Sequence, residues 1–253
     1  MNLVFASGFL VPQIIPGTAY FRGLEAHLAG RHATLFPHVS PLGSSEQRAR
    51  QLADAIDKTF PDGPVHIIAH SMGGLDGRVL IARNHHGLSS PGRIASLTTL
   101  STPHLGSPVA DLIAGPKPGG LRGLQYDIIR GAVDGLGIST GAIEDLTTAK
   151  ASRMPDVAAT HPHIRYRSYA ATGRHTEPVT SPIFLLTHKY IRFETGQEND
   201  GLVTLKSAQY GEFQQPIWAG DHADIVGHNL DIPPRGESKF DHLAEIDAII
   251  ARL

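Results

Sequence analysis

The serine at position 71 stands in a context that can make a side-chain hydroxyl nucleophilic. It lies in the run AHSMGG (residues 69–74), at the end of the apolar segment Val65–His70 and before a helical pattern. A serine held in a sharp turn between a strand and a helix exposes its oxygen, and the residues two before and two after it must be small. Ala69 and Gly73 meet that requirement. The context predicts a nucleophile elbow with Ser71 at its tip, at a helix start that favours developing negative charge.

A nucleophilic serine of this kind needs two N–H donors to hold an oxyanion. One donor is the residue after the serine, here Met72, and the other follows an early strand. Gly8 and Phe9 follow the apolar run Leu3–Ala6 after a single residue, Ser7. Gly8 lets the backbone bend toward a substrate, so we predict that the Phe9 N–H is the second donor.

An elbow serine also needs an acid and a histidine, which follow it in that order along the chain. The run ENDGLV (residues 198–203) offers Asp200 before a glycine turn, and the run WAGDHAD (residues 218–224) offers His222 after the last predicted strand. A histidine in that place can reach back over the sheet edge to Ser71, while the acid orients its imidazole. We therefore predict a triad of Ser71, Asp200 and His222.

Other residues compete for these two roles. The chain has 15 histidines, so a single histidine carries little weight, and His228 and His242 also follow the last predicted strand. His242 lies within a helical pattern, and His228 is further from the strand end. Asp221 and Asp224 are the alternative acids.

Short apolar segments alternate with amphipathic helical patterns along most of the chain. The predicted strands are Leu3–Ala6, Ala33–Val39, Val65–His70, Ile94–Leu100, Ile164–Ala171 and Phe213–Ala219. The predicted helices are Tyr20–Ala29, Ser44–Phe60, Met72–Arg83 and Phe240–Leu253. This alternation predicts a mostly parallel sheet with helices on both faces, in a single domain spanning residues 1–253.

Two stretches interrupt that alternation. Residues 114–145 begin with glycine and proline and continue with amphipathic patterns. We interpret them as a helical insertion above the sheet that can act as a lid over an active site. Residues 172–201 are polar and are predicted to be irregular.

The composition excludes several classes of function. The chain has no cysteine, which excludes thiol catalysis and disulfides. A net charge of −2 and an aromatic content of 6% predict no nucleic-acid partner. The sequence contains no run of 18 apolar residues, so no membrane-spanning segment is predicted. Without a signal segment the chain is expected in the cytoplasm, and a secreted location would require that such a segment had been removed.

The motifs together resemble the true bacterial triacylglycerol lipases of family I, in the α/β-hydrolase superfamily, over nearly the whole chain. The similar segments are residues 8–10, 17–24, 70–74, 101–107 and 199–203. Ser7 differs from the histidine that the family usually has there, and the disulfide of many members cannot form. The insertion is also shorter and more polar than the usual lid.

The resemblance implies a helical lid, transient contact with a lipid interface, and a structural calcium ion that takes no part in the chemistry. Asp224, two residues after His222, matches a calcium-ligand position, and Glu177 resembles the second carboxylate ligand. No cofactor is expected for the reaction itself.

The sequence thus predicts a monomeric serine carboxylic-ester hydrolase, either a triacylglycerol lipase or a carboxylesterase, with ester or lipid substrates. An acyltransferase or a depolymerase of short polyesters would use the same triad. A non-catalytic binding module is disfavoured, because such a protein would be expected to lose a triad position.

Overall fold

The computed structural model describes residues 1–9, 18–135, 140–173, 181–230 and 240–253. Its sheet has the strand order β2-β1-β3-β4-β5-β6, and neighbouring strands pair in parallel. The strands are β1 (Asn2–Ala6), β2 (Ala33–Leu35), β3 (Val65–His70), β4 (Ile94–Leu100), β5 (Arg165–Tyr169) and β6 (Glu212–Phe213). Parallel pairing requires a crossover between strands, and helices supply most of these crossovers.

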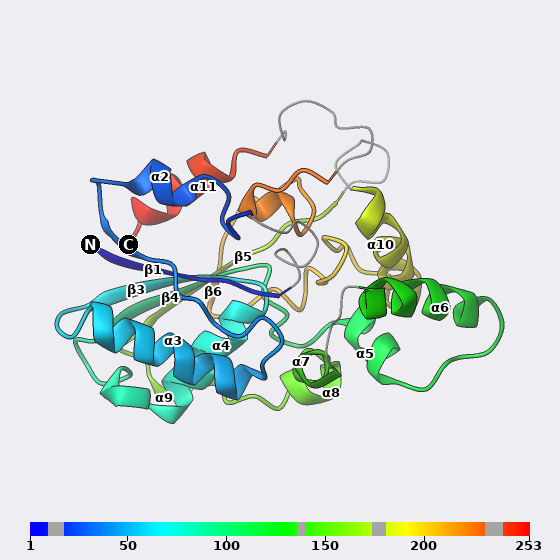
Figure 1. The fold of residues 1–253 in the computed structure, drawn as a ribbon, viewed down its shortest axis with the longest axis horizontal. Helices are drawn as coiled ribbons and strands as arrows, with labels where there is room; N and C mark the ends of the chain where they lie inside the picture. Colours follow the sequence, from blue (N-terminus) through cyan, green and yellow to red (C-terminus); the bar gives the residue numbers. More distant parts are fainter. Residues whose placement is uncertain (10–17, 136–139, 174–180, 231–239) are drawn as a thin grey trace.

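Helices cover both faces of this sheet and its carboxyl edge (Figure 1). They are α2 (Leu24–Leu28), α3 (Ser45–Thr59), α4 (Met72–Arg83), α5 (Pro108–Ala114), α6 (Gly120–Gly135), α7 (Thr140–Asp145), α8 (Thr148–Ala151), α9 (Val157–Thr160), α10 (Pro182–Thr195) and α11 (His242–Ile250), with short 3₁₀ turns at His85–Gly87 and Asp224–Val226. In Figure 1, α2 and α11 lie on one face and α3, α4 and α9 on the other. The helices α5–α8 and α10 lie beyond the strand ends.

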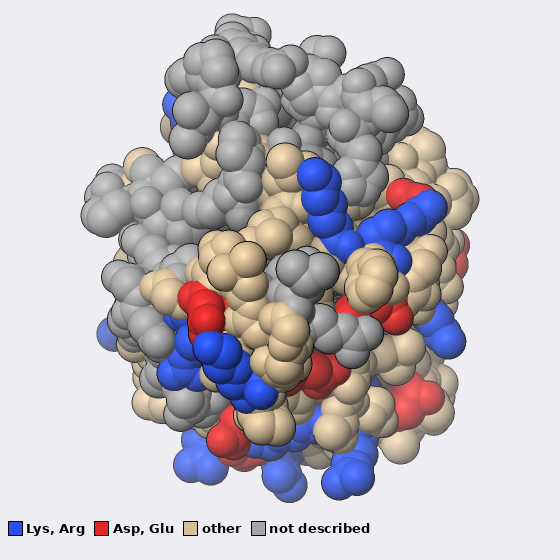
Figure 2. All heavy atoms as spheres, turned by 90° about the vertical axis from the view of Figure 1, so that its right-hand side faces the viewer, with Lys and Arg blue, Asp and Glu red and all other residues tan. Residues whose placement is uncertain are grey.

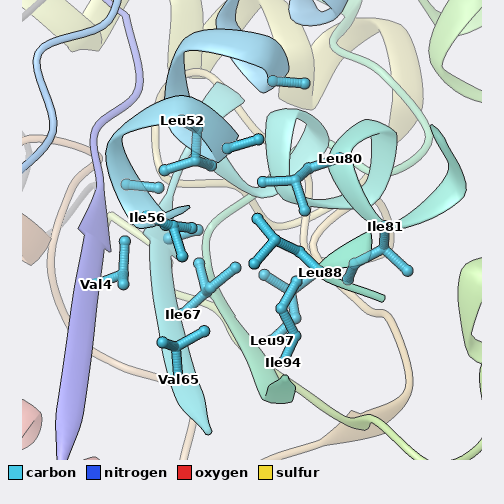
Figure 3. Close-up of a cluster of buried hydrophobic side chains, with 14 of the residues drawn as sticks. Val4, Leu52, Ile56, Val65, Ile67, Leu80, Ile81, Leu88, Ile94 and Leu97 are labelled. Carbon is cyan, nitrogen blue, oxygen red and sulfur yellow. The ribbon is translucent and has the colours of Figure 1, made fainter. Parts of the chain in front are cut away.

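The alternation of side chains along the strands explains why both faces are covered. In β1, Val4 packs into the core beneath α3 and α4, whereas Leu3 and Phe5 pack into the core beneath α2 and α11. Successive side chains of a strand point to opposite faces, so a strand that is apolar at every position needs two covering layers. Figure 3 shows the first of these cores, where Leu52 and Ile56 of α3 meet Ile67 of β3.

The sequence predictions of the central elements match the structure closely, and the edges differ. Helix α4 and the strands β3 and β4 have the predicted bounds. The predicted strand Ala33–Val39 ends at Leu35, before Pro37, and the predicted strand Phe213–Ala219 is reduced to Glu212–Phe213. Proline has no N–H to donate to a neighbouring strand, which limits strands near Pro37 and Pro216.

The prediction that residues 172–201 are irregular was wrong for Pro182–Thr195. Helix α10 occupies Pro182–Thr195 and has a proline in its first turn. Its buried residues Tyr190 and Ile191 join a third core with α5, α6 and α7. The predicted insertion at 114–145 is helical as expected, although Leu136 and Ile138 of its apolar pattern lie outside the described residues.

None of the helices in the described ranges is both long and apolar enough to span a lipid bilayer.

Candidate active site

Ser71 lies in a strained turn between β3 and α4, as the elbow predicts. Its backbone has φ 55° and ψ −132°, a left-handed φ that non-glycine residues rarely adopt. The close approach of α4 to β1 explains the glycine two residues later. A Cβ at Gly73 would lie 2.5 Å from the carbonyl oxygen of Ala6 and 2.8 Å from that of Ser7. A larger residue at 73 would therefore force the first turn of α4 away from the sheet.

The structure brings Ser71, His222 and Asp200 into one hydrogen-bonded chain. The Ser71 hydroxyl lies 2.9 Å from Nε2 of His222, and Nδ1 of His222 lies 2.8 Å from Oδ2 of Asp200. All three residues are buried, and the Asp200 side chain is fully excluded from solvent. When Nδ1 donates its proton to the carboxylate, Nε2 is free to accept the serine proton. The arrangement can remove a proton from Ser71 and return it to a leaving group.

Backbone N–H groups hold Asp200 in this orientation. Its Oδ1 accepts hydrogen bonds from the N–H groups of Leu202 (3.0 Å) and Val203 (2.7 Å), which leaves Oδ2 to face the imidazole. Gly201 has a φ of 99°, and a Cβ there would lie 2.6 Å from that of Phe184. The glycine turn in the sequence run is thus required by the tight packing of α10 against the acid.

The alternative bases and acids are engaged elsewhere. Nε2 of His228 lies 2.9 Å from the carbonyl oxygen of Tyr20, and Nε2 of His242 lies 2.7 Å from that of Arg22. Asp221 uses Oδ2 to accept the N–H and hydroxyl of Ser181 and Oδ1 to accept two N–H groups of its own loop. None of these contacts involves Ser71.

The predicted oxyanion donors lie where the third core meets the elbow. Phe9 and Met72 are buried in one cluster with side chains of α5, α6, α7 and α10. Met72 is the first residue of α4, where backbone N–H groups have no partner within the helix. An acyl chain attached at Ser71 would therefore have apolar side chains close at hand.

Sequence reasoning missed a buried arginine that donates hydrogen bonds to the loop before Phe9. Arg48 of α3 is fully buried and pairs with Asp76 of α4 at 2.8 Å. Its guanidinium also donates to the carbonyl oxygens of Ser7 (2.6 Å) and Gly8 (3.3 Å). Burial raises the pKa of Asp76 to about 7, against the opposing effect of the Arg48 charge. The sequence signal is an arginine on a helix face that is otherwise apolar except for Ser45.

The described residues leave the predicted calcium site unconfirmed. Asp224 accepts the N–H of Asp221 at 2.9 Å, and Glu177 lies outside the described residues. Within those residues, no three His, Asp or Glu side chains gather in a way that could hold a metal ion. Calcium takes six to eight oxygen ligands, so a single carboxylate is too few. The hydrogen bonds of Asp221 already fix the loop that a calcium ion would be expected to hold.

Known proteins that resemble this chain include two lipases. No family model matches the chain. Triacylglycerol lipase 2 of Saccharomyces cerevisiae is 30% identical over an alignment of 224 residues that covers 82% of this chain and 62% of the yeast protein. A triacylglycerol lipase of Vibrio cholerae is 30% identical over 122 residues, which are 47% of this chain and 37% of that protein. The chain thus spans less than two thirds of the length of either relative.

Solved structures of lipases and esterases share the fold. A metagenomic carboxyl esterase, MGS0156, superposes with a TM-score of 0.77 at 18% identity, covering 100% of this chain and 75% of that one. The mature Bacillus licheniformis lipase BlEst2 superposes with a TM-score of 0.64 at 22% identity, covering 92% of this chain and 89% of that one. The narrower resemblance to family I stays a prediction. The parallel sheet, the elbow and these superpositions establish that the chain has the α/β-hydrolase fold.

Proposed function

We propose that the chain is a carboxylic-ester hydrolase that works through an acyl-enzyme on Ser71. His222 takes the hydroxyl proton as Ser71 attacks the ester carbonyl, and it passes that proton to the leaving alcohol. The N–H groups of Phe9 and Met72 hold the oxyanion. Water, activated by the same imidazole, then releases the acid.

The observation that carries this proposal is the pair of short contacts that link Ser71 to His222 and His222 to Asp200. The resemblance to two triacylglycerol lipases also supports the hydrolysis of a carboxylic-ester bond. Because the reaction needs only a hydroxyl, an imidazole, a carboxylate and backbone donors, no cofactor enters any step.

The test is a panel of p-nitrophenyl esters of increasing acyl length, together with an emulsified triglyceride. Each is run with the natural protein and with Ser71→Ala, and a fluorophosphonate probe reports whether Ser71 is modified. We expect hydrolysis and labelling by the natural protein and neither by the variant. Absence of both from the natural protein would contradict the proposal and favour a binding module. Faster transfer of the acyl group from Ser71 to an added alcohol than to water would favour the acyltransferase alternative.

Exposed apolar side chains on the helices beyond the strand ends favour an ester that is carried by lipid. Leu124 and Ile128 of α6 are more than half exposed, and Phe193 of α10 is 73% exposed. Leu124 and Ile128 are one helical turn apart, so they share one side of α6. Figure 2 shows the face of the molecule toward which α6 projects, where uncharged surface lies among side chains of both charges. We propose that α6 contacts the lipid that carries the substrate and serves as the lid.

Calcium can be tested separately from the chemistry. Asp221 holds the loop that carries His222, here called the base loop, through protein hydrogen bonds. We therefore expect excess EDTA to leave Tm and ester hydrolysis unchanged. A bound ion at a hundredfold excess over its Kd stabilises by about 2.7 kcal/mol, so its removal would lower Tm by several degrees. A fall of that size, reproduced by Asp224→Ala or Glu177→Ala, would restore the calcium site that the resemblance implies.

A further inference from the structure

The hydroxyl of Tyr20 lies inside the molecule, between the oxyanion loop and the residue before the nucleophile. It is 2.7 Å from Nδ1 of His70. The Gly8 N–H also donates to it, which lowers the tyrosine pKa against the larger effect of burial. A Cβ at Gly8 would lie 2.6 Å from this hydroxyl and 2.6 Å from Cβ of Ser71. One phenol oxygen therefore touches both the loop and the elbow.

The hydrogen bond between Tyr20 and His70 can form with the tyrosine hydroxyl as the donor. Burial raises the pKa of Tyr20, so its hydroxyl keeps its proton, and burial lowers the pKa of His70 well below the usual range, so that ring is neutral. The phenol oxygen accepts the Gly8 N–H and donates its proton to Nδ1 of His70. The proton of His70 then sits on Nε2.

The neutral His70 ring faces the predicted base. The ring centroids of His70 and His222 are 4.5 Å apart, with planes inclined by 41°. A positive charge on His70 would disfavour the imidazolium that forms on His222 when Ser71 attacks. The nearby His222 adds to the effect of burial in lowering the pKa of His70. Donation by Tyr20 to Nδ1 keeps the ring in one tautomer and in one orientation.

The backbone that carries Tyr20 is tied to the far end of the base loop. Nε2 of His228 lies within hydrogen-bond distance of the Ala19 and Tyr20 carbonyl oxygens, and the Arg22 N–H donates to the Val226 carbonyl at 3.0 Å. The tyrosine is thus fixed from outside the site before its hydroxyl reaches inward.

We propose that Tyr20 and His70 are a positioning pair, which fixes Gly8 of the oxyanion loop against Ser71 and holds the His70 ring beside that of His222. The inference rests on the proposed ester hydrolysis. Neither residue touches the reacting atoms; both act through the Phe9 N–H that follows Gly8 and through the imidazole of His222.

Tyr20→Phe is the sharpest test, because it keeps the ring that packs on Phe21 and removes only the oxygen. We expect kcat to fall about tenfold to a hundredfold with KM within twofold, less than the 10²–10³ lost with a direct oxyanion donor. Affinity for a trifluoromethyl ketone, which mimics the tetrahedral oxyanion, should fall by the same factor. Tyr166→Phe removes another buried hydroxyl, from β5, and should change neither quantity.

Substitutions of His70 separate positioning from simple packing. His70→Asn removes the ring beside His222 but places an amide oxygen near the position of Nδ1, so it can accept from Tyr20 and should retain more of the kcat than His70→Leu. His70→Leu cannot accept and should lose as much as Tyr20→Phe, and the double variant should be no worse than either single one. A lowered Tm with unchanged kcat and analogue affinity in Tyr20→Phe would overturn the pair.

The outcome is distinguishable from failure of the proposed function. If fluorophosphonate labels the natural protein but no ester is hydrolysed, ester hydrolysis is wrong, and the labelling rates of the same variants then decide for or against the pair. If the natural protein is not labelled, both are overturned.

Discussion

The carboxyl edge of the sheet and the helices beyond it are built by different means. At the sheet edge the polar groups of Ser71, His222 and Asp200 are buried and bonded to one another. On α6, Leu124 and Ile128 are exposed, and Lys117 pairs with Asp127 at the surface. A buried polar group must keep its partner because desolvation is costly, whereas an exposed apolar side chain holds no fixed geometry. The first region is suited to exact placement and the second to adaptable contact.

Removing the proposed nucleophile or the proposed base should have the largest effect on the sheet-edge region. Ser71→Ala and His222→Ala should each lower kcat by about 10⁴ to 10⁶, the range observed when a triad member that acts as part of a unit is removed. The measurement is steady-state hydrolysis of a p-nitrophenyl ester with Tm as the check on folding. His228→Ala is the matched control, and its activity should stay within about tenfold of the natural protein. If His228→Ala abolished turnover and His222→Ala did not, the assignment of His222 as the base would be wrong.

Removing one partner of the buried ion pair should lower the free energy of unfolding. Arg48→Met leaves Asp76 buried without its partner, which costs about 3–5 kcal/mol. Because burial already raises the pKa of Asp76 to about 7, the lone carboxyl can become neutral, and the loss should be smaller at pH 5 than at pH 8. Urea unfolding at both pH values measures the effect. Arg48→Met with Asp76→Leu should recover stability, and an equally unstable double variant would contradict the argument.

Acid should weaken the sheet-edge region through its buried histidines. Burial lowers the pKa values of His70 and His104 well below the usual range. Below pH 6.5 the unfolded chain binds protons that the folded chain does not, so stability is complete above that pH and falls as the pH decreases. Each histidine should cost at most about 2 kcal/mol at pH 5, the limit that 1.36 kcal/mol per pH unit sets between pH 6.5 and pH 5. The free energy of unfolding of His70→Asn should decline less between pH 7 and pH 5 than that of the natural protein. Identical declines would show that His70 does not cause the loss of stability in acid.

Changing the exposed side of α6 should have the smallest effect on folding. Leu124→Ser and Ile128→Ser should change the free energy of unfolding by no more than about 0.5 kcal/mol. Their neighbour Ile129 is 5% exposed, and Ile129→Ala should cost about 2–5 kcal/mol. If α6 meets lipid, the serine variants should lose activity on emulsified triglyceride while hydrolysing a soluble short ester normally. Equal activity on both substrates would argue for an esterase without a lid.

Local sequence determined the elbow and the elements around it. The requirement for small residues at 69 and 73 acts within a few positions of Ser71, and the apolar run of β3 followed by a helical pattern is visible in one short window. The acid and the base could be proposed because each follows a strand or glycine turn, although sequence left His228, His242 and Asp221 open. Helix α10 escaped prediction because polar runs flank it and its buried face is completed by other helices.

The tertiary structure alone decided which side chains share a bond across long stretches of chain. Arg48 reaches the carbonyl of Ser7, 41 residues earlier, and Tyr20 reaches His70, 50 residues later. Helical periodicity places Arg48 on a buried face but does not say which oxygens surround it there. Periodicity reports only which face of an element is covered, whereas the partner of a buried polar group is set by the packing of elements that are remote in sequence.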